Sequence, residues 1–179
     1  DLARQESARA LEISPTFVRT YYEVAQAYIN KGDLENAFIW FEKAQKLQPD
    51  VAVTYWYMGT VRYQIAAKSQ DIAGTKEAVG YFSAALEKGY SLTEGDAQKL
   101  VNAFLQVGDM KSVVAVFQNL TVSFPAKSQY LSSLATAYVK IGRIQDAISA
   151  ARKVIELSSG DAATQAEAEQ FIRALGGTP

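Results

Sequence analysis

Residues 18–51 have the sequence VRTYYEVAQAYINKGDLENAFIWFEKAQKLQPDV, and this stretch predicts two helices joined by a turn. Apolar residues recur at spacings of three and four in each half, which places them on one face of a helix. Gly32 and Asp33 suit the turn, because glycine readily ends a helix and aspartate caps the next one. Pro49 ends the second helix. The apolar face residues are Tyr21, Val24, Ala25 and Tyr28 in the first half and Ala37, Phe41 and Ala44 in the second.

The same landmarks recur along the chain with a regular period, which is about 34 residues long. The interval from Pro15 to Pro49 equals the interval from Gly108 to Gly142. The interval from Gly32 to Gly108 is two such periods with eight additional residues. A single helix pair cannot cover its own apolar faces. A repeat of this length therefore predicts a row of helix pairs that pack on one another.

These landmarks resemble the tetratricopeptide repeat, whose pattern has an aromatic residue, Leu-Gly, Tyr, Ala, Phe, Ala and Pro at fixed steps. The resemblance covers nearly the whole chain. It implies an all-α fold without strands, in which antiparallel helix pairs form a right-handed α-solenoid, the tetratricopeptide repeat superhelix. The matching residues are Tyr21, Val24, Ala25, Tyr28, Ala37, Phe41, Ala44 and Pro49, then Tyr55, Met58, Gly59, Ala78, Phe82 and Ala85, then Leu100, Phe104, Phe117 and Pro125, then Leu131, Leu134, Ala135, Tyr138 and Ala147.

A single array of repeats is expected to fill residues 1–179. In the second complete repeat, most of the eight extra residues lie in 67–74, AKSQDIAG. They either add about one turn to each helix or form a longer loop. We interpret them as a surface insertion, and a ridge that shapes the binding face is the alternative. The expected segments are 1–17, the second helix of a truncated repeat; 18–51, 52–93, 94–127 and 128–161, the repeats; and 162–175, a C-terminal capping helix.

Composition argues against several classes of function. The sequence has no histidine and no cysteine, so it lacks the commonest general base, the commonest metal ligand and any thiol nucleophile. Its 18 Lys and Arg residues are balanced by 19 Asp and Glu residues, which does not favour nucleic acid as a partner. No apolar run approaches the roughly 18 residues that a membrane span needs. We therefore expect no catalysis, no cofactor, no metal site and no membrane insertion by this chain, and its localisation stays open.

The resemblance also implies a binding surface. In this family the first helix of each pair lines a concave groove, and the second, fifth, ninth and twelfth positions of each repeat face it. Tyr22 and Trp56 are then large amphipathic anchors, and Gln26 can donate to and accept from a peptide backbone. The alternative is that these are ordinary solvated surface residues. The expected groove residues are Arg19, Tyr22, Gln26, Trp56, Thr60, Tyr63, Gln98, Asn102, Ser132 and Thr136.

The favoured hypothesis is a non-catalytic interaction scaffold that binds an extended peptide or a partner helix in this groove. Its aromatic, neutral residues predict poor selectivity for acidic C-terminal tails, which chaperone adaptors of the same superfamily hold with lysine, asparagine and arginine. The alternative is a self-associating spacer that forms a weak homodimer through residues 2–13 or the outer helices. The strings VTYWYMG, KGY and FIRALGG are similar to repeat tails of bacterial O-antigen ligase and polymerase-type membrane proteins, which implies a spacer appended to a cell-envelope membrane protein.

Overall fold

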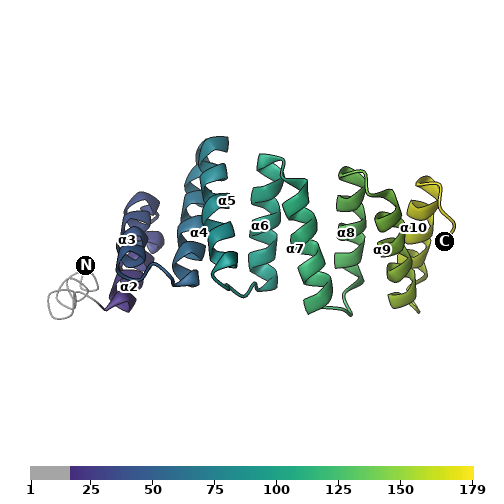
Figure 1. The fold of residues 1–179 in the computed structure, drawn as a ribbon, viewed down its shortest axis with the longest axis horizontal. Helices are drawn as coiled ribbons and strands as arrows, with labels where there is room; N and C mark the ends of the chain where they lie inside the picture. Colours follow the sequence, from purple (N-terminus) through teal and green to yellow (C-terminus); the bar gives the residue numbers. More distant parts are fainter. Residues whose placement is uncertain (1–16) are drawn as a thin grey trace. The chain divides into compact units, whose positions relative to one another are not determined.

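The computed structural model describes residues 17–179, and this part of the chain contains α-helices joined by short connections, without any strand (Figure 1). The helices follow one another as antiparallel pairs, which agrees with the all-α fold of helix pairs expected from the periodicity. Their bounds are α2 Val18–Asn30, α3 Leu34–Leu47, α4 Ala52–Ser69, α5 Ile72–Glu87, α6 Glu94–Val107, α7 Met110–Ser123, α8 Ser128–Lys140, α9 Ile144–Leu157 and α10 Ala162–Ala174.

The described helices belong to two compact units that divide after Thr93. The first unit contains α2 to α5, and the second unit contains α6 to α10. Within each unit, helices that are consecutive in the sequence pack against each other. The half repeat predicted for residues 1–17, and the dimer surface predicted for residues 2–13, fall outside the described residues except for Phe17.

The core of the first unit combines small residues with large ones. Ala25 of α2 and Ala37 of α3 are fully buried, so the backbones of these two helices approach closely. Phe41 and Met58 fill the space beside them, and Val61 continues the same cluster on α4. This is the packing that the spacing of apolar residues in 18–51 predicts, because those residues share one face of each helix.

The last helix of the second unit covers the pair that precedes it. Ile172 of α10 is fully buried in a cluster with Ile148 and Ala151 of α9, while Phe171 and Leu175 pack at the edge of the same cluster. The remaining face of α10 is mostly polar and exposed. A helix with one apolar and one polar face can end an array, because it buries the last pair and presents its other side to water.

The eight extra residues of the second repeat lengthen its helices. Helix α4 has 18 residues and α5 has 16, compared with 13 in α2 and 14 in α3. Only Gln70 and Asp71 connect α4 to α5, so the alternative of a longer loop is wrong. Figure 1 shows the ends of α4 and α5 extending past α2 and α3. Arg62 of α4 pairs with Glu77 of α5, at 2.5 Å between Nε and Oε2.

Aspartate caps begin three of the described helices. The side chains of Asp33, Asp109 and Asp161 accept from the backbone N–H three residues further on, as the sequence predicts for Asp33. At Asp109 the preceding residue is Gly108, whose φ of +75° suits the turn between α6 and α7. Hydrogen bonds from the Ser112 hydroxyl and from backbone N–H groups lower the pKa of Asp109 below its usual range.

Replacing Asp109 by alanine is expected to lower the free energy of unfolding by about 1 kcal/mol at neutral pH, because the first turn of α7 loses its cap. The folded-state pKa of Asp109 is lowered, so the charged carboxylate adds stability above the unfolded pKa, near 4, and this part is lost as the pH falls through the folded pKa. Urea unfolding of the unchanged chain and of Asp109→Ala, at neutral pH and at about pH 3, measures the loss in the free energy of unfolding at each pH. The control Asp109→Asn keeps an acceptor but has no charge, so it should lose only the charge-dependent part of the stability at neutral pH and little at the acidic pH. An equal alanine penalty at both pH values would contradict the charge effect.

No helix among residues 17–179 is both long enough and apolar enough to cross a membrane.

Candidate functional site

A hollow on the first unit brings together three of the residues that the sequence places in a binding groove. It has a volume of about 260 Å³, and we call it the tyrosine hollow. Arg19, Tyr22 and Gln26 of α2 belong to it, so one face of this helix supplies most of its lining. Its residues are Arg19, Tyr22, Glu23, Gln26, Phe41 and Tyr57.

Three aromatic rings form the floor and wall of the tyrosine hollow. The Tyr57 ring stacks on Phe41 with centroids 5.2 Å apart, and Tyr22 meets Tyr57 edge-on at 5.9 Å. A hydrogen bond of 2.5 Å between Tyr22 Oη and Thr54 Oγ1 holds the Tyr22 ring in place. Phe41 is buried, whereas 38% of Tyr57 is exposed. The hollow therefore presents a rigid aromatic surface whose outermost ring is that of Tyr57.

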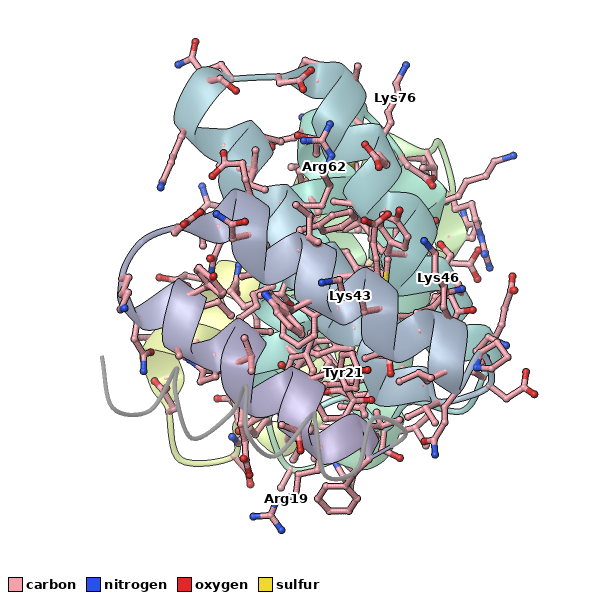
Figure 2. All side chains as sticks on the ribbon, turned by 90° about the vertical axis from the view of Figure 1, so that its left-hand side faces the viewer. Arg19, Tyr21, Lys43, Lys46, Arg62 and Lys76 are labelled. Carbon is pink, nitrogen blue, oxygen red and sulfur yellow. The ribbon has the colours of Figure 1, made fainter. Side chains whose placement is uncertain are left out.

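The rim of the tyrosine hollow is polar and has no net charge. Arg19 pairs with Glu23 at 3.1 Å, and both side chains are largely exposed. Figure 2 shows Arg19 pointing away from the helices, whereas Tyr21 lies among them. Gln26 donates from Nε2 to Asn30 Oδ1 at 2.9 Å, and its second amide hydrogen and its carbonyl oxygen have no other partner within residues 17–179.

Trp56 is not a surface anchor, and this part of the sequence prediction is wrong. Its side chain is only 3% exposed. The indole lies flat against Tyr90, with centroids 4.6 Å apart and 7° between the ring planes, and it also meets Phe82 at 4.8 Å. Tyr90 belongs to the connection between α5 and α6. Its ring covers the indole and makes Trp56 a core residue.

Tyr57 belongs to the tyrosine hollow, although the repeat positions did not predict it. It follows Trp56 directly, so the two rings leave α4 in different directions. The consecutive aromatics Tyr55, Trp56 and Tyr57 were a signal that one ring faces the solvent. Which of them does so depends on Tyr90, and repeat positions alone do not contain that information.

Thr60 and Tyr63 lie further along α4, outside the tyrosine hollow. Both are partly buried. The Thr60 hydroxyl oxygen is buried and has no hydrogen-bond partner among the described residues. The structure does not bring these two predicted residues together with Arg19, Tyr22 and Gln26.

The second unit carries the remaining predicted residues in two places. Gln98 and Asn102 are exposed on α6 and hydrogen-bond to each other, from Nε2 to Oδ1 at 3.1 Å. Ser132 and Thr136 of α8 belong to a hollow of about 180 Å³ formed with α9 and α10, which we call the hydroxyl hollow. Its residues are Ser132, Ala135, Thr136, Ala151, Val154, Thr164, Glu167, Ala168 and Phe171.

Thr136 also belongs to a second hollow of the same unit, of about 310 Å³, which we call the apolar hollow. Side chains of α6, α7 and α8 form its surface, with Lys140 as its charged residue. Leu105 is half exposed there. The residues are Val101, Leu105, Met110, Val113, Phe117, Ser133, Thr136, Ala137 and Lys140.

Three titratable groups of the second unit whose pKa values are shifted form a structural cluster. Glu94, at the start of α6, accepts hydrogen bonds from Lys127 and Tyr130 at the start of α8. The hydrogen bond from Lys127 and then that from Tyr130 lower the pKa of Glu94, while the bond to Glu94 raises the pKa of Lys127 and of Tyr130. These shifts favour an ionised Glu94 and protonated Lys127 and Tyr130, which are the forms that make the two hydrogen bonds. The cluster therefore links α6 to α8.

Residues 17–179 contain no group of three or more acidic, histidine or cysteine side chains that could hold a metal ion.

Two stretches of the chain match models of a known protein family. Residues 18–51 match a family model of the tetratricopeptide repeat, and residues 99–162 match a second model with the same description. The two matches together cover more than half of the chain. This chain is a tetratricopeptide repeat protein. The unmatched residues between the two regions include the lengthened helices α4 and α5. As a tetratricopeptide repeat protein, the chain is a non-catalytic scaffold for protein–protein interactions.

Solved structures agree on the fold of this tetratricopeptide repeat protein. YrrB, a tetratricopeptide repeat protein with an unusual peptide-binding site, aligns over 92% of this chain and 82% of its own, with a TM-score of 0.65 and 19% identity. Naa15/Naa10 bound to HypK-THB aligns over 94% of this chain and 28% of that chain, with a TM-score of 0.68 and 16% identity.

A third similar structure is TTC0263, a thermophilic protein of Thermus thermophilus, which aligns over 92% of this chain and 86% of its own, with a TM-score of 0.54 and 14% identity. At such identities the likeness concerns the fold alone. No curated protein matches the sequence.

Proposed function

We propose that this tetratricopeptide repeat protein binds an extended peptide segment of a partner protein, and that the tyrosine hollow receives one apolar or aromatic side chain of that peptide. The observation that carries this proposal is the exposed Tyr57 ring, fixed by its stacking on Phe41 beside the half-buried Tyr22. A rigid aromatic surface loses little conformational entropy on binding, which is why tyrosine is frequent at binding hot spots.

The polar rim supports an extended backbone as the ligand. Among residues 17–179, Gln26 keeps one free amide hydrogen and a free carbonyl oxygen, which match the C=O and N–H groups of a peptide in extended conformation. The fold likeness to YrrB, which has a peptide-binding site, supports the same class of ligand.

The charges at the rim favour a neutral peptide over an acidic tail. Arg19 is the cation of the tyrosine hollow, and Glu23 already pairs with it. An added carboxylate would have to compete with Glu23 for Arg19 in an exposed setting, where ion pairs contribute little. The proposal therefore keeps the expectation of poor selectivity for acidic C-terminal tails.

Replacing Tyr57 by alanine is expected to weaken peptide binding roughly thirtyfold, the effect of losing a hot-spot ring worth about 2 kcal/mol. The probe is a peptide selected on the whole chain from a random phage-displayed library and then labelled for fluorescence anisotropy. Nuclear magnetic resonance mapping of the labelled chain, with shifts at Tyr22 and Gln26, identifies the peptides that bind at the tyrosine hollow.

Two variants serve as controls for this measurement. Ile39 is 45% exposed on α3 and does not belong to the tyrosine hollow, so Ile39→Ala should bind the peptide as the unchanged chain does. Tyr57→Phe keeps the ring and should bind within a fewfold of the unchanged chain. The proposal fails if Tyr57→Ala binds every selected peptide with unchanged affinity, or if no peptide shifts resonances at this hollow.

A further inference from the structure

In the hydroxyl hollow of the second unit, the hydroxyl groups all donate their hydrogens to acceptors within the protein. The Ser132 hydroxyl donates to the Ser128 carbonyl oxygen at 3.4 Å, and the Thr136 hydroxyl donates to the Ser132 carbonyl oxygen at 3.1 Å. Both bonds stay within α8. On α10, the Thr164 hydroxyl donates to the capping carboxylate of Asp161 at 2.6 Å. All three hydroxyl hydrogens are therefore already used inside the protein.

A hydroxyl group has a single hydrogen and two lone pairs, so each of these three oxygens is left as an acceptor. Glu167, the fourth polar residue of the hollow, has a carboxylate that only accepts when ionised. Within the described part of the chain, Glu167 forms no ion pair and no hydrogen bond through its side chain. The hollow thus offers acceptors and one negative charge to a ligand, and its side chains offer no donor.

The remaining surface of the hollow is apolar. Val154 of α9 is buried beneath it, and Ala168 and Phe171 of α10 form one side. A ligand that fits this surface has an apolar stem and ends in a cationic group with several hydrogens. Lysine and arginine side chains have both properties, because their methylene stems pack on apolar surfaces while the charged head reaches acceptors. The Phe171 ring can add a cation–π contribution.

Other ligands fit this set of groups less well. A serine or amide side chain would leave the Glu167 charge without a counter-ion. A metal ion needs several charged or strongly donating ligands, and no group of three acidic side chains of that kind exists among residues 17–179.

We infer that the hydroxyl hollow binds a lysine or arginine side chain of the partner peptide, with Glu167 as the counter-ion. This inference rests on the proposed function, because it concerns the same partner peptide that the tyrosine hollow is proposed to bind. It adds a requirement for a basic residue, whereas the tyrosine hollow takes an apolar or aromatic one. The two hollows belong to different units, so each contribution can be measured separately.

The test uses the isotope-labelled full chain and three blocked pentapeptides, AAKAA, AARAA and AAQAA, in nuclear magnetic resonance titrations. The two basic peptides should shift the amide resonances of Thr136, Thr164 and Glu167 with saturable curves, and AAQAA should bind about tenfold more weakly. Glu167→Gln should weaken binding of the basic peptides about threefold, because Glu167 is exposed and an exposed ion pair contributes less than a buried one. A comparison of AAKAA with AARAA shows which basic side chain is preferred.

Glu156→Gln is the matched control, since Glu156 is an exposed acid of α9 outside the hollow and its loss changes the net charge equally. It should leave binding of AAKAA within twofold of the unchanged chain. Equal binding of AAQAA and AAKAA, unshifted resonances at the hollow, or equal losses in Glu167→Gln and Glu156→Gln would each overturn the inference. The peptide selected for the Tyr57 experiment separates the two proposals. If the selected peptide binds Tyr57→Ala more weakly but AAKAA fails the tests above, the proposed function stands and the inference fails.

Discussion

Replacing Trp56 by alanine is expected to lower the free energy of unfolding of the first unit by about 3–5 kcal/mol, the usual effect of removing a buried tryptophan or phenylalanine ring. The indole fills the space between Phe82 of α5 and Tyr90, so its loss opens a cavity and separates the connection after α5 from the helices. Urea unfolding followed by Trp40 fluorescence measures this effect, because Trp40 lies in the same unit and remains in the variant.

The neighbouring residue is the matched control for this prediction. Tyr57→Ala removes a ring that is 38% exposed, and its stability effect should be about 1 kcal/mol, well below that of Trp56→Ala. The two variants should therefore differ in kind: Trp56→Ala changes mainly the free energy of unfolding, and Tyr57→Ala changes mainly the affinity for the peptide. An unfolding free energy that falls more in Tyr57→Ala than in Trp56→Ala would contradict the assignment of Trp56 to the core.

Replacing Gly59 by alanine is expected to destabilise the first unit by about 1–3 kcal/mol, although alanine favours a helix over glycine by about 1 kcal/mol. A Cβ atom at this position would lie 2.6 Å from Cδ1 and 2.8 Å from Cε1 of the Phe82 ring. Phe82 is fully buried and rests on Trp56, so its ring cannot move aside without disturbing the indole. Gly59 is thus a position where α4 and α5 approach too closely for any side chain.

Gly80 in α5 provides a comparison, because its replacement by alanine should raise the free energy of unfolding instead of lowering it. A Cβ atom built there meets nothing within 4 Å, so Gly80→Ala should stabilise the same unit by about 0.5–1 kcal/mol through helix propensity alone. Measuring both variants by urea unfolding with Trp fluorescence separates the clash from the propensity effect. A stabilising Gly59→Ala substitution would show that the Phe82 ring has room to move.

Sequence periodicity predicts the helices of this protein well, because it depends on local chemistry. Gly108 and Asp109 mark the end of one helix and the start of the next through backbone conformation and capping, which involve residues close together in the chain. The face of α2 that carries Arg19, Tyr22 and Gln26 follows from helical spacing in the same way. For this helix, the residues that share a surface could be predicted without a structure.

Prediction was less successful where a distant segment decides burial. Trp56 occupies the same repeat position as Tyr22, yet it is covered by Tyr90, which lies a full repeat length further along the chain. The eight extra residues between α4 and α5 could form helix or loop by local criteria. In the structure most of residues 67–74 are helical, and Arg62 pairs with Glu77 across the two lengthened helices.

The sequence by itself determined the repeat, the pairing of helices and the turn residues of this protein, since these depend on the spacing of apolar side chains and on the backbone preferences of single residues. The tertiary structure alone decided which aromatic ring of α4 is exposed, and that the hydroxyl groups of α8 line the same hollow as Thr164 and Glu167 of α10. Both depend on contacts between helices, and the pattern of one helix does not contain them.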